Sequence, residues 1–76
     1  MDLSGKWIST YKNGIQLIVT RENENLFVFV QSNNPKNHGK LMVDGDTVYL
    51  VGTKKGKIQD KNLIKWDKAG GIWTRY

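Results

Sequence analysis

The segment that decides the fold is Trp7-Ile8-Ser9-Thr10-Tyr11-Lys12-Asn13-Gly14-Ile15-Gln16-Leu17-Ile18-Val19. It holds two short runs of β-favouring residues around a turn signal, which is typical of an antiparallel hairpin. A three-residue loop, Lys12-Asn13-Gly14, pairs Tyr11 with Ile15, whereas a two-residue Asn-Gly turn mixes polar and apolar side chains on both faces. We predict the longer loop, with a bulge at the glycine. This register places one set of side chains on a single face: Trp7, Ser9, Tyr11, Ile15, Leu17 and Val19.

The rest of the chain repeats this pattern of short β-favouring runs between turn residues, and no stretch has a helical period. Most connections are short, so strands that follow one another should pair antiparallel. We predict an all-β fold, an antiparallel meander of about eight short strands that closes into a small barrel, because closure removes exposed sheet edges. The expected strands are residues 6–12, 15–21, 26–32, 40–43, 47–51, 56–59, 63–66 and 72–75.

Two connections complete this prediction. Residues 33–39 are interpreted as a polar loop, and Asp44-Gly45 as a two-residue turn that directs Leu41, Val43, Val48 and Leu50 inward.

A barrel of eight strands is just wide enough for its own side chains to fill it. We therefore expect no deep internal pocket, because a set of large side chains points inward: Trp7, Tyr11, Leu17, Val28, Leu41 and Leu50.

Length and composition limit how such a domain is stabilised. The chain has 76 residues, so residues 1–76 form a single domain, and only 38% of them are hydrophobic. It contains no cysteine and one histidine, which excludes disulfides and thiolate chemistry and argues against a structural zinc site. We expect no cofactor. Sheet closure and association with another chain are the remaining ways to support a small core.

The segment Leu26-Phe27-Val28-Phe29-Val30 does not alternate, because both of its faces are apolar. We expect Leu26, Val28 and Val30 to point inward. Phe27 and Phe29 then point outward and, with Ile18, form the interface of a homo-oligomer. Met42, Tyr49 and Val51 should face outward on later strands. The alternative is a bulge that returns one phenylalanine to the core.

The positive charge of the chain is concentrated in one region. The net charge is +5, and residues 53–68 carry six lysines against two aspartates. An anionic partner is therefore expected here. The predicted ligand-binding residues are Lys54, Lys55, Lys57, Lys61, Trp66 and Tyr49. Lysines beside aromatic residues are typical of nucleic-acid and nucleotide sites, but lysines also serve solubility, and alternating tryptophans such as Trp66 and Trp73 often lie in a core.

No motif indicates catalysis. His38 lies in the predicted polar loop with only Ser32 and Asp44 nearby, and a catalytic base needs a nucleophile and an orienting group within reach. Asp44 and Asp46 lack the further oxygen ligands of a calcium loop. Gly52 to Lys57 has neither the spacing of a phosphate-binding loop nor a following helix. We predict that the protein is not an enzyme and has no metal site.

The two ends of the chain resemble the calycin pattern of lipocalins and avidins. Gly5-Lys6-Trp7 matches the Gly-x-Trp of the first strand in those families, and Arg75 matches the arginine of the closing strand. The resemblance implies a barrel in which the Arg75 guanidinium packs over the Trp7 indole. The resemblance therefore gives Gly5, Trp7 and Arg75 a structural role. Calycin chains are much longer and enclose a ligand pocket. The resemblance therefore implies a barrel fold for this chain and does not imply a ligand.

The sequence favours a non-catalytic binding protein. No signal peptide and no run of about eighteen apolar residues is found, so we expect a cytoplasmic protein that does not span a membrane. The preferred interpretation is an oligomeric small barrel that binds or sequesters a protein or a small anionic ligand, for example as an inhibitor. One alternative is a nucleic-acid or nucleotide-binding barrel that uses the basic stretch Lys54–Lys68. The other is a structural subunit of a larger assembly.

Overall fold

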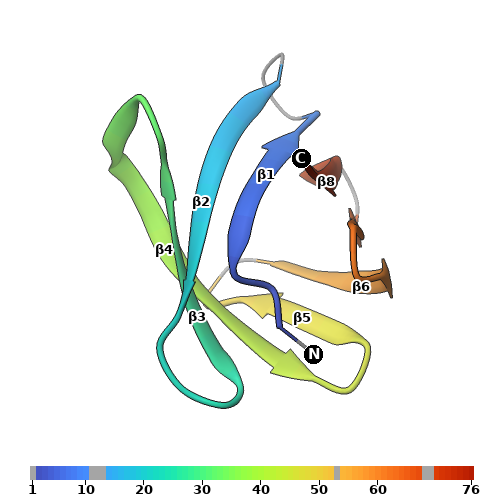
Figure 1. Cartoon of the computed structure of the whole chain (residues 1–76). Helices are drawn as coiled ribbons and strands as arrows, with labels where there is room; N and C mark the ends of the chain where they lie inside the picture. Colours follow the sequence, from blue (N-terminus) through green and yellow to red (C-terminus); the bar gives the residue numbers. More distant parts are fainter. Residues whose placement is uncertain (1, 11–13, 53, 68–69) are drawn as a thin grey trace.

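The protein is a closed antiparallel barrel of eight strands connected as a simple meander. The computed structural model describes residues 2–10, 14–52, 54–67 and 70–76 (Figure 1). The strands are β1 (Gly5–Ser9), β2 (Ile15–Arg21), β3 (Leu26–Gln31), β4 (Asn34–Asp44), β5 (Thr47–Leu50), β6 (Lys54–Asp60), β7 (Leu63–Trp66) and β8 (Ile72–Arg75). Each strand pairs with its neighbour in sequence, and β1 pairs with β8 to close the sheet. The predicted fold class is confirmed.

The longest strand, β4, corrects the prediction of a polar loop at residues 33–39. Residues 34–39 belong to the strand, where His38 pairs with Val30 and Asn34 pairs with Gln31. The register shifts between these two pairs, which leaves residues 35–37 as a bulge. A bulge tolerates Pro35, which has no amide hydrogen to donate to the ladder. Residues 34–38 are exposed and mostly polar, so their composition predicts a loop although the segment belongs to a strand.

The first hairpin has the predicted faces in a shifted register. Ser9 pairs with Ile15 and Trp7 pairs with Leu17, whereas the prediction paired Tyr11 with Ile15. Residues 11–13 lie outside the described residues. Strand β1 ends early because Thr10 turns toward β8, where its amide donates to the carbonyl of Ile72 (2.9 Å) and its hydroxyl accepts from the Ile72 amide (3.0 Å). A shift of two residues leaves the described side chains of both strands on their predicted faces.

The second predicted turn is also displaced by one residue. Asp44 pairs with Thr47, so the two-residue turn is Gly45-Asp46. Gly45 has a φ of +63°, a conformation that glycine adopts without steric cost. Leu41, Val43 and Val48 are buried as predicted, and Leu50 is partly buried.

Strand β3 is oriented opposite to the prediction. Phe27 is fully buried and Phe29 is 8% exposed, whereas Leu26, Val28 and Val30 lie on the outer side and are half-buried. Phe27 pairs with Leu41, and Phe29 pairs with Gly39. A Cβ on Gly39 would lie 2.8 Å from the Phe29 ring, so the glycine provides the space that this ring occupies. The larger aromatic side chains therefore enter the core, and neither can form an oligomer interface.

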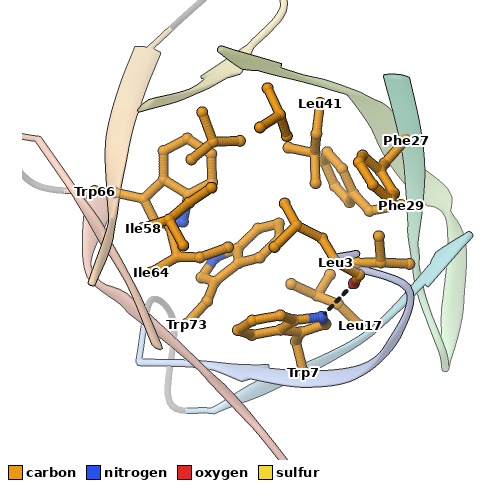
Figure 2. Packing of buried hydrophobic residues seen from close by; sticks show 13 residues of the cluster. Leu3, Trp7, Leu17, Phe27, Phe29, Leu41, Ile58, Ile64, Trp66 and Trp73 are labelled. Carbon is orange, nitrogen blue, oxygen red and sulfur yellow. Dashed lines mark hydrogen bonds between the residues drawn. The ribbon is translucent and has the colours of Figure 1, made fainter. Parts of the chain in front are cut away.

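The core extends through the barrel as one cluster, and the largest side chains in it are aromatic (Figure 2). The buried hydrophobic residues are Leu3, Trp7, Leu17, Val19, Phe27, Phe29, Leu41, Val43, Val48, Ile58, Ile64, Trp66 and Trp73. Leu3 precedes β1 and lies next to Trp7, whose indole Nε1 donates to the Leu3 carbonyl at 2.8 Å. This segment closes one end of the barrel. The part of the chain that the structure describes includes no helix long and apolar enough to cross a membrane.

Candidate functional site at the open end of the barrel

The end of the barrel opposite Leu3 contains a cavity of about 560 Å³. It lies where β1, β3, β5 and β7 end and β2, β4, β6 and β8 begin. The residues around it are Ser9, Ile15, Leu17, Phe29, Gln31, Asn34, Asn37, Leu50, Lys54, Gly70 and Trp73. Side chains fill the barrel at the Leu3 end, as predicted. The other end differs from the prediction, because it is hollowed.

The floor of the cavity is apolar and aromatic. Trp73 meets Phe29 edge to face, with ring centroids 5.5 Å apart and planes at 75°. Trp66 packs against the other side of Trp73 at 5.2 Å and 63°. Edge-to-face pairs hold the rings in defined positions. The floor is thus a rigid apolar surface, joined by the side chain of Leu17.

The wall beside β3 and β4 is lined by amide side chains. Gln31 accepts a hydrogen bond from Asn37 Nδ2 at 2.9 Å and donates from Nε2 to Asn33 Oδ1 at 2.8 Å. Both ends of the Gln31 amide are therefore fixed. The bulge at residues 35–37 brings Asn34 and Asn37 to the cavity, and bulges are common next to binding sites because they redirect side chains.

A single charged side chain lines the cavity among the described residues, that of Lys54 at the start of β6. Its aliphatic stem passes close to Gly70, because a Cβ built on Gly70 would lie 3.2 Å from Lys54 Cδ. Lysine can place its methylene groups against apolar surface while its ammonium remains hydrated. The site therefore combines an apolar floor, an amide wall and one cation at the rim.

The structure does not bring all six predicted ligand-binding residues together, although three of them share one face of the sheet. Lys54 lines the cavity, while Lys55, Lys57 and Tyr49 lie on the outer surface of the sheet. Lys61 is at the other end, where its carbonyl accepts hydrogen bonds from Arg75. Trp66 is 5% exposed and belongs to the core, and its Nε1 has no hydrogen-bond partner among the described residues.

The cavity residues that sequence reasoning missed are the polar ones at inward positions. Ser9 occupies the inner face of β1 and is 3% exposed, and Gln31 continues the inner series of Phe27 and Phe29. In the sequence, these positions are indicated by a polar residue on a strand face that is otherwise apolar. Alternation does not reveal Gln31 because both faces of β3 are apolar, and it does not reveal Asn34 and Asn37 because a polar run of this composition predicts a loop.

His38 lies on the outer face of β4, opposite Val30, and is exposed. Asp44 is six residues further along the same strand, a distance of about 20 Å at 3.3 Å per residue. This pair does not form a catalytic arrangement. Within the described ranges, no three acidic or histidine side chains gather as metal ligands.

The closed end contains the three residues of the Gly-x-Trp and arginine pattern in contact. The Arg75 guanidinium lies 4.4 Å from the centroid of the Trp7 ring. A Cβ on Gly5 would lie 2.8 Å from Arg75 Nη1, and the φ of Gly5 is +131°, so this position requires glycine. The backbone amide of Ser4 donates to Asp2 at 2.9 Å and its hydroxyl at 2.7 Å, and these bonds lower the pKa of Asp2 from its ordinary value.

Comparisons of the chain with protein-family models, with curated proteins and with solved structures found no match.

Proposed function

We propose that this protein is a non-catalytic binding protein that holds a small amphipathic anion in the open end of its barrel. The observation that carries this proposal is the combination of an aromatic floor, fixed amide side chains and Lys54 around one cavity. Ligand sites are commonly concave, mostly apolar and supplied with a few polar groups that orient the ligand. A volume of about 560 Å³ lies within the usual range for such sites.

The positions of these groups favour a ligand with three chemically different parts. An apolar or aromatic body would rest on Trp73, Phe29 and Leu17, where burial of apolar surface supplies most of the affinity. A carboxylate, sulfonate or phosphate would remain at the rim near Lys54. The amides of Asn34 and Asn37 would orient polar atoms between these two parts. A compact organic acid meets all three requirements.

The organisation of the barrel supports a calycin-like architecture as part of this proposal. The Trp7 and Arg75 contact lies at one end and the cavity at the other. In this arrangement the closed end stabilises the barrel and the open end binds the ligand. We further propose a cytoplasmic protein that sequesters its ligand and associates with copies of itself. Ile18 (40% exposed) and Met42 (49% exposed) provide outer apolar surface for that association.

The test uses a matched pair of fluorescent probes. We expect the anionic probe 1-anilinonaphthalene-8-sulfonate to bind more tightly than uncharged N-phenyl-1-naphthylamine and to quench tryptophan emission through Trp73. Lys54→Gln should weaken binding of the anionic probe about fivefold, equivalent to about 1 kcal/mol, and leave the neutral probe unchanged. Lys55→Gln is the control, because Lys55 is the next residue on β6 and faces outward.

A second variant separates the cavity from the surface. Leu50→Trp enlarges a side chain that lines the mouth and should abolish binding of both probes without loss of the folded state. Equal binding of both probes to the wild-type protein and to Leu50→Trp would place them elsewhere and refute the proposal. Far-ultraviolet circular dichroism verifies that the variant is folded.

A further inference from the structure

The outer surface of β5, β6 and β7 carries three lysines and a tyrosine, a group separate from the residues around the cavity. Inward and outward side chains alternate along these strands, so Tyr49, Lys55, Lys57 and Lys65 all face outward. We call these four residues the basic face. Lys54 points to the cavity on the other side of the same sheet, so the basic face is separate from the proposed ligand site.

The lysines of the basic face oppose one another across the sheet. Lys57 pairs directly with Lys65, and like charges at directly opposed positions destabilise a sheet. Asp46 is the one carboxylate within 4 Å of the basic-face ammonium groups among the described residues, at 3.6 Å from Lys57. Both side chains of that pair are about two-thirds exposed (63% and 65%), so it offsets little of the repulsion. A bound anionic partner would relieve it.

The aromatic ring of Tyr49 lies next to the lysines of the basic face. Tyr49 is 40% exposed and pairs with Lys55 on one side and Met42 on the other. A solvent-exposed ring beside a row of cations provides two different contacts, stacking and charge neutralisation. A nucleic acid strand needs both, because each nucleotide has a flat base and a negative phosphate. Charge neutralisation of an acidic peptide or an anionic membrane does not require the ring.

We propose that the basic face binds single-stranded nucleic acid without sequence preference. Phosphates contact Lys55, Lys57 and Lys65, and one base stacks on Tyr49. Lys57 and Lys65 lie side by side on adjacent strands, about 5 Å apart at Cβ, so they neutralise adjoining positions of one backbone. Because the contacts are to phosphates and to the face of a base, binding is sensitive to salt and tolerant of sequence.

Fluorescence anisotropy with a labelled oligothymidylate at several salt concentrations tests the proposal. Three phosphate contacts predict a slope of log K against log salt of about −2, at about −0.7 for each contact. The double variant Lys57→Gln/Lys65→Gln should reduce this slope to about −0.7. Tyr49→Ala should weaken binding at least fivefold, and Tyr49→Phe, which keeps the ring, should restore it.

The matched control is Lys6→Gln/Lys36→Gln, which removes the same charge from β1 and β4. It should retain the wild-type slope. If this control weakens binding as much as the basic-face variant, net charge alone is responsible and the proposal is wrong. Equal competition by polyglutamate or phosphatidylserine vesicles would assign the face to an acidic protein or a membrane and would overturn it.

Two further measurements distinguish a loss of nucleic-acid binding from unfolding and from an effect at the cavity. Lys57→Gln/Lys65→Gln should unfold at the same temperature as the wild-type protein or higher, because it removes opposed like charges. Lys54→Gln, which tests the proposed ligand site, should leave the affinity for the oligonucleotide within twofold. A large loss from Lys54→Gln would place the nucleic acid at the barrel mouth and refute the assignment to the basic face.

Discussion

The guanidinium of Arg75 lies over the indole of Trp7 at 4.4 Å and also donates to backbone carbonyls on both sides of the barrel seam. Its nitrogens donate to the carbonyls of Asp2, Ser4 and Lys61. These contacts join the segment before β1, the last strand and the turn between β6 and β7. One side chain therefore holds three parts of the chain together at the closed end.

We expect Arg75→Lys to lower the free energy of unfolding by about 2 kcal/mol. A lysine retains the positive charge, but its donors sit on one nitrogen, whereas the guanidinium makes four hydrogen bonds from three nitrogens and covers the indole with a planar group. Urea unfolding followed by tryptophan fluorescence measures the effect. Gly5→Ala should have a similar effect, because its Cβ would lie 2.8 Å from Arg75 Nη1. Unchanged midpoints for both variants would show that the contact contributes little.

Phe27→Ala should destabilise the protein by about 3–5 kcal/mol, because the ring is fully buried and its removal leaves a cavity. Ile18→Ala on the outer face is the comparison and should change stability by about 0.5 kcal/mol or less. Chemical unfolding of both variants provides the measurement. If Phe27→Ala kept its stability and instead changed the mass found by light scattering, the ring would belong to an interface after all.

The close approach of Gly39 and Phe29 predicts energetic coupling between these two positions. Gly39→Ala should cost about 1–3 kcal/mol, since the new methyl group would meet the ring at 2.8 Å. In a Phe29→Leu background the same substitution should cost clearly less. A double-mutant cycle measures the difference. Additive effects would mean that the ring and the glycine do not constrain each other.

The Asp2 carboxylate provides a prediction about pH. Its pKa is lowered in the folded protein, first by the hydrogen bond from the Ser4 amide, so its ionised form favours folding. That contribution is complete above the ordinary pKa of 3.8 and is lost as the pH falls through the lower folded value. Asp2→Asn should therefore be less stable than the wild-type protein at pH 7, and the difference should be smaller at about pH 2. A stability difference that is the same at both pH values would contradict this.

The parts of the fold that sequence could predict are those where polar and apolar residues alternate. In the first hairpin the faces were correct although the register moved, because a shift by an even number of residues keeps each side chain on its side. Strand β3 has apolar residues on both faces, so alternation carried no information there. Its orientation depends on Gly39, a residue ten positions away that leaves room for Phe29.

The candidate site was less predictable for the same reason. Its amide wall depends on the bulge at residues 35–37, which is a property of strand pairing and has no local signature beyond Pro35. Charge indicates Lys54, Lys55 and Lys57 together, and the expected strand at residues 56–59 leaves Lys54 in a turn rather than on an inward position of the strand. Once β6 begins at Lys54, alternation separates the cavity lysine from the outer ones.

The seam between β1 and β8 has a consequence for the order of events in folding. Every other pairing joins strands that are consecutive in the chain, so each hairpin forms by closing a short loop. Only the pairing of β1 with β8, in which Trp7 lies opposite Arg75, requires the two ends of the chain to meet. We expect that late encounter to limit the folding rate, so that substitutions along the seam slow refolding more than equally destabilising substitutions within a single hairpin.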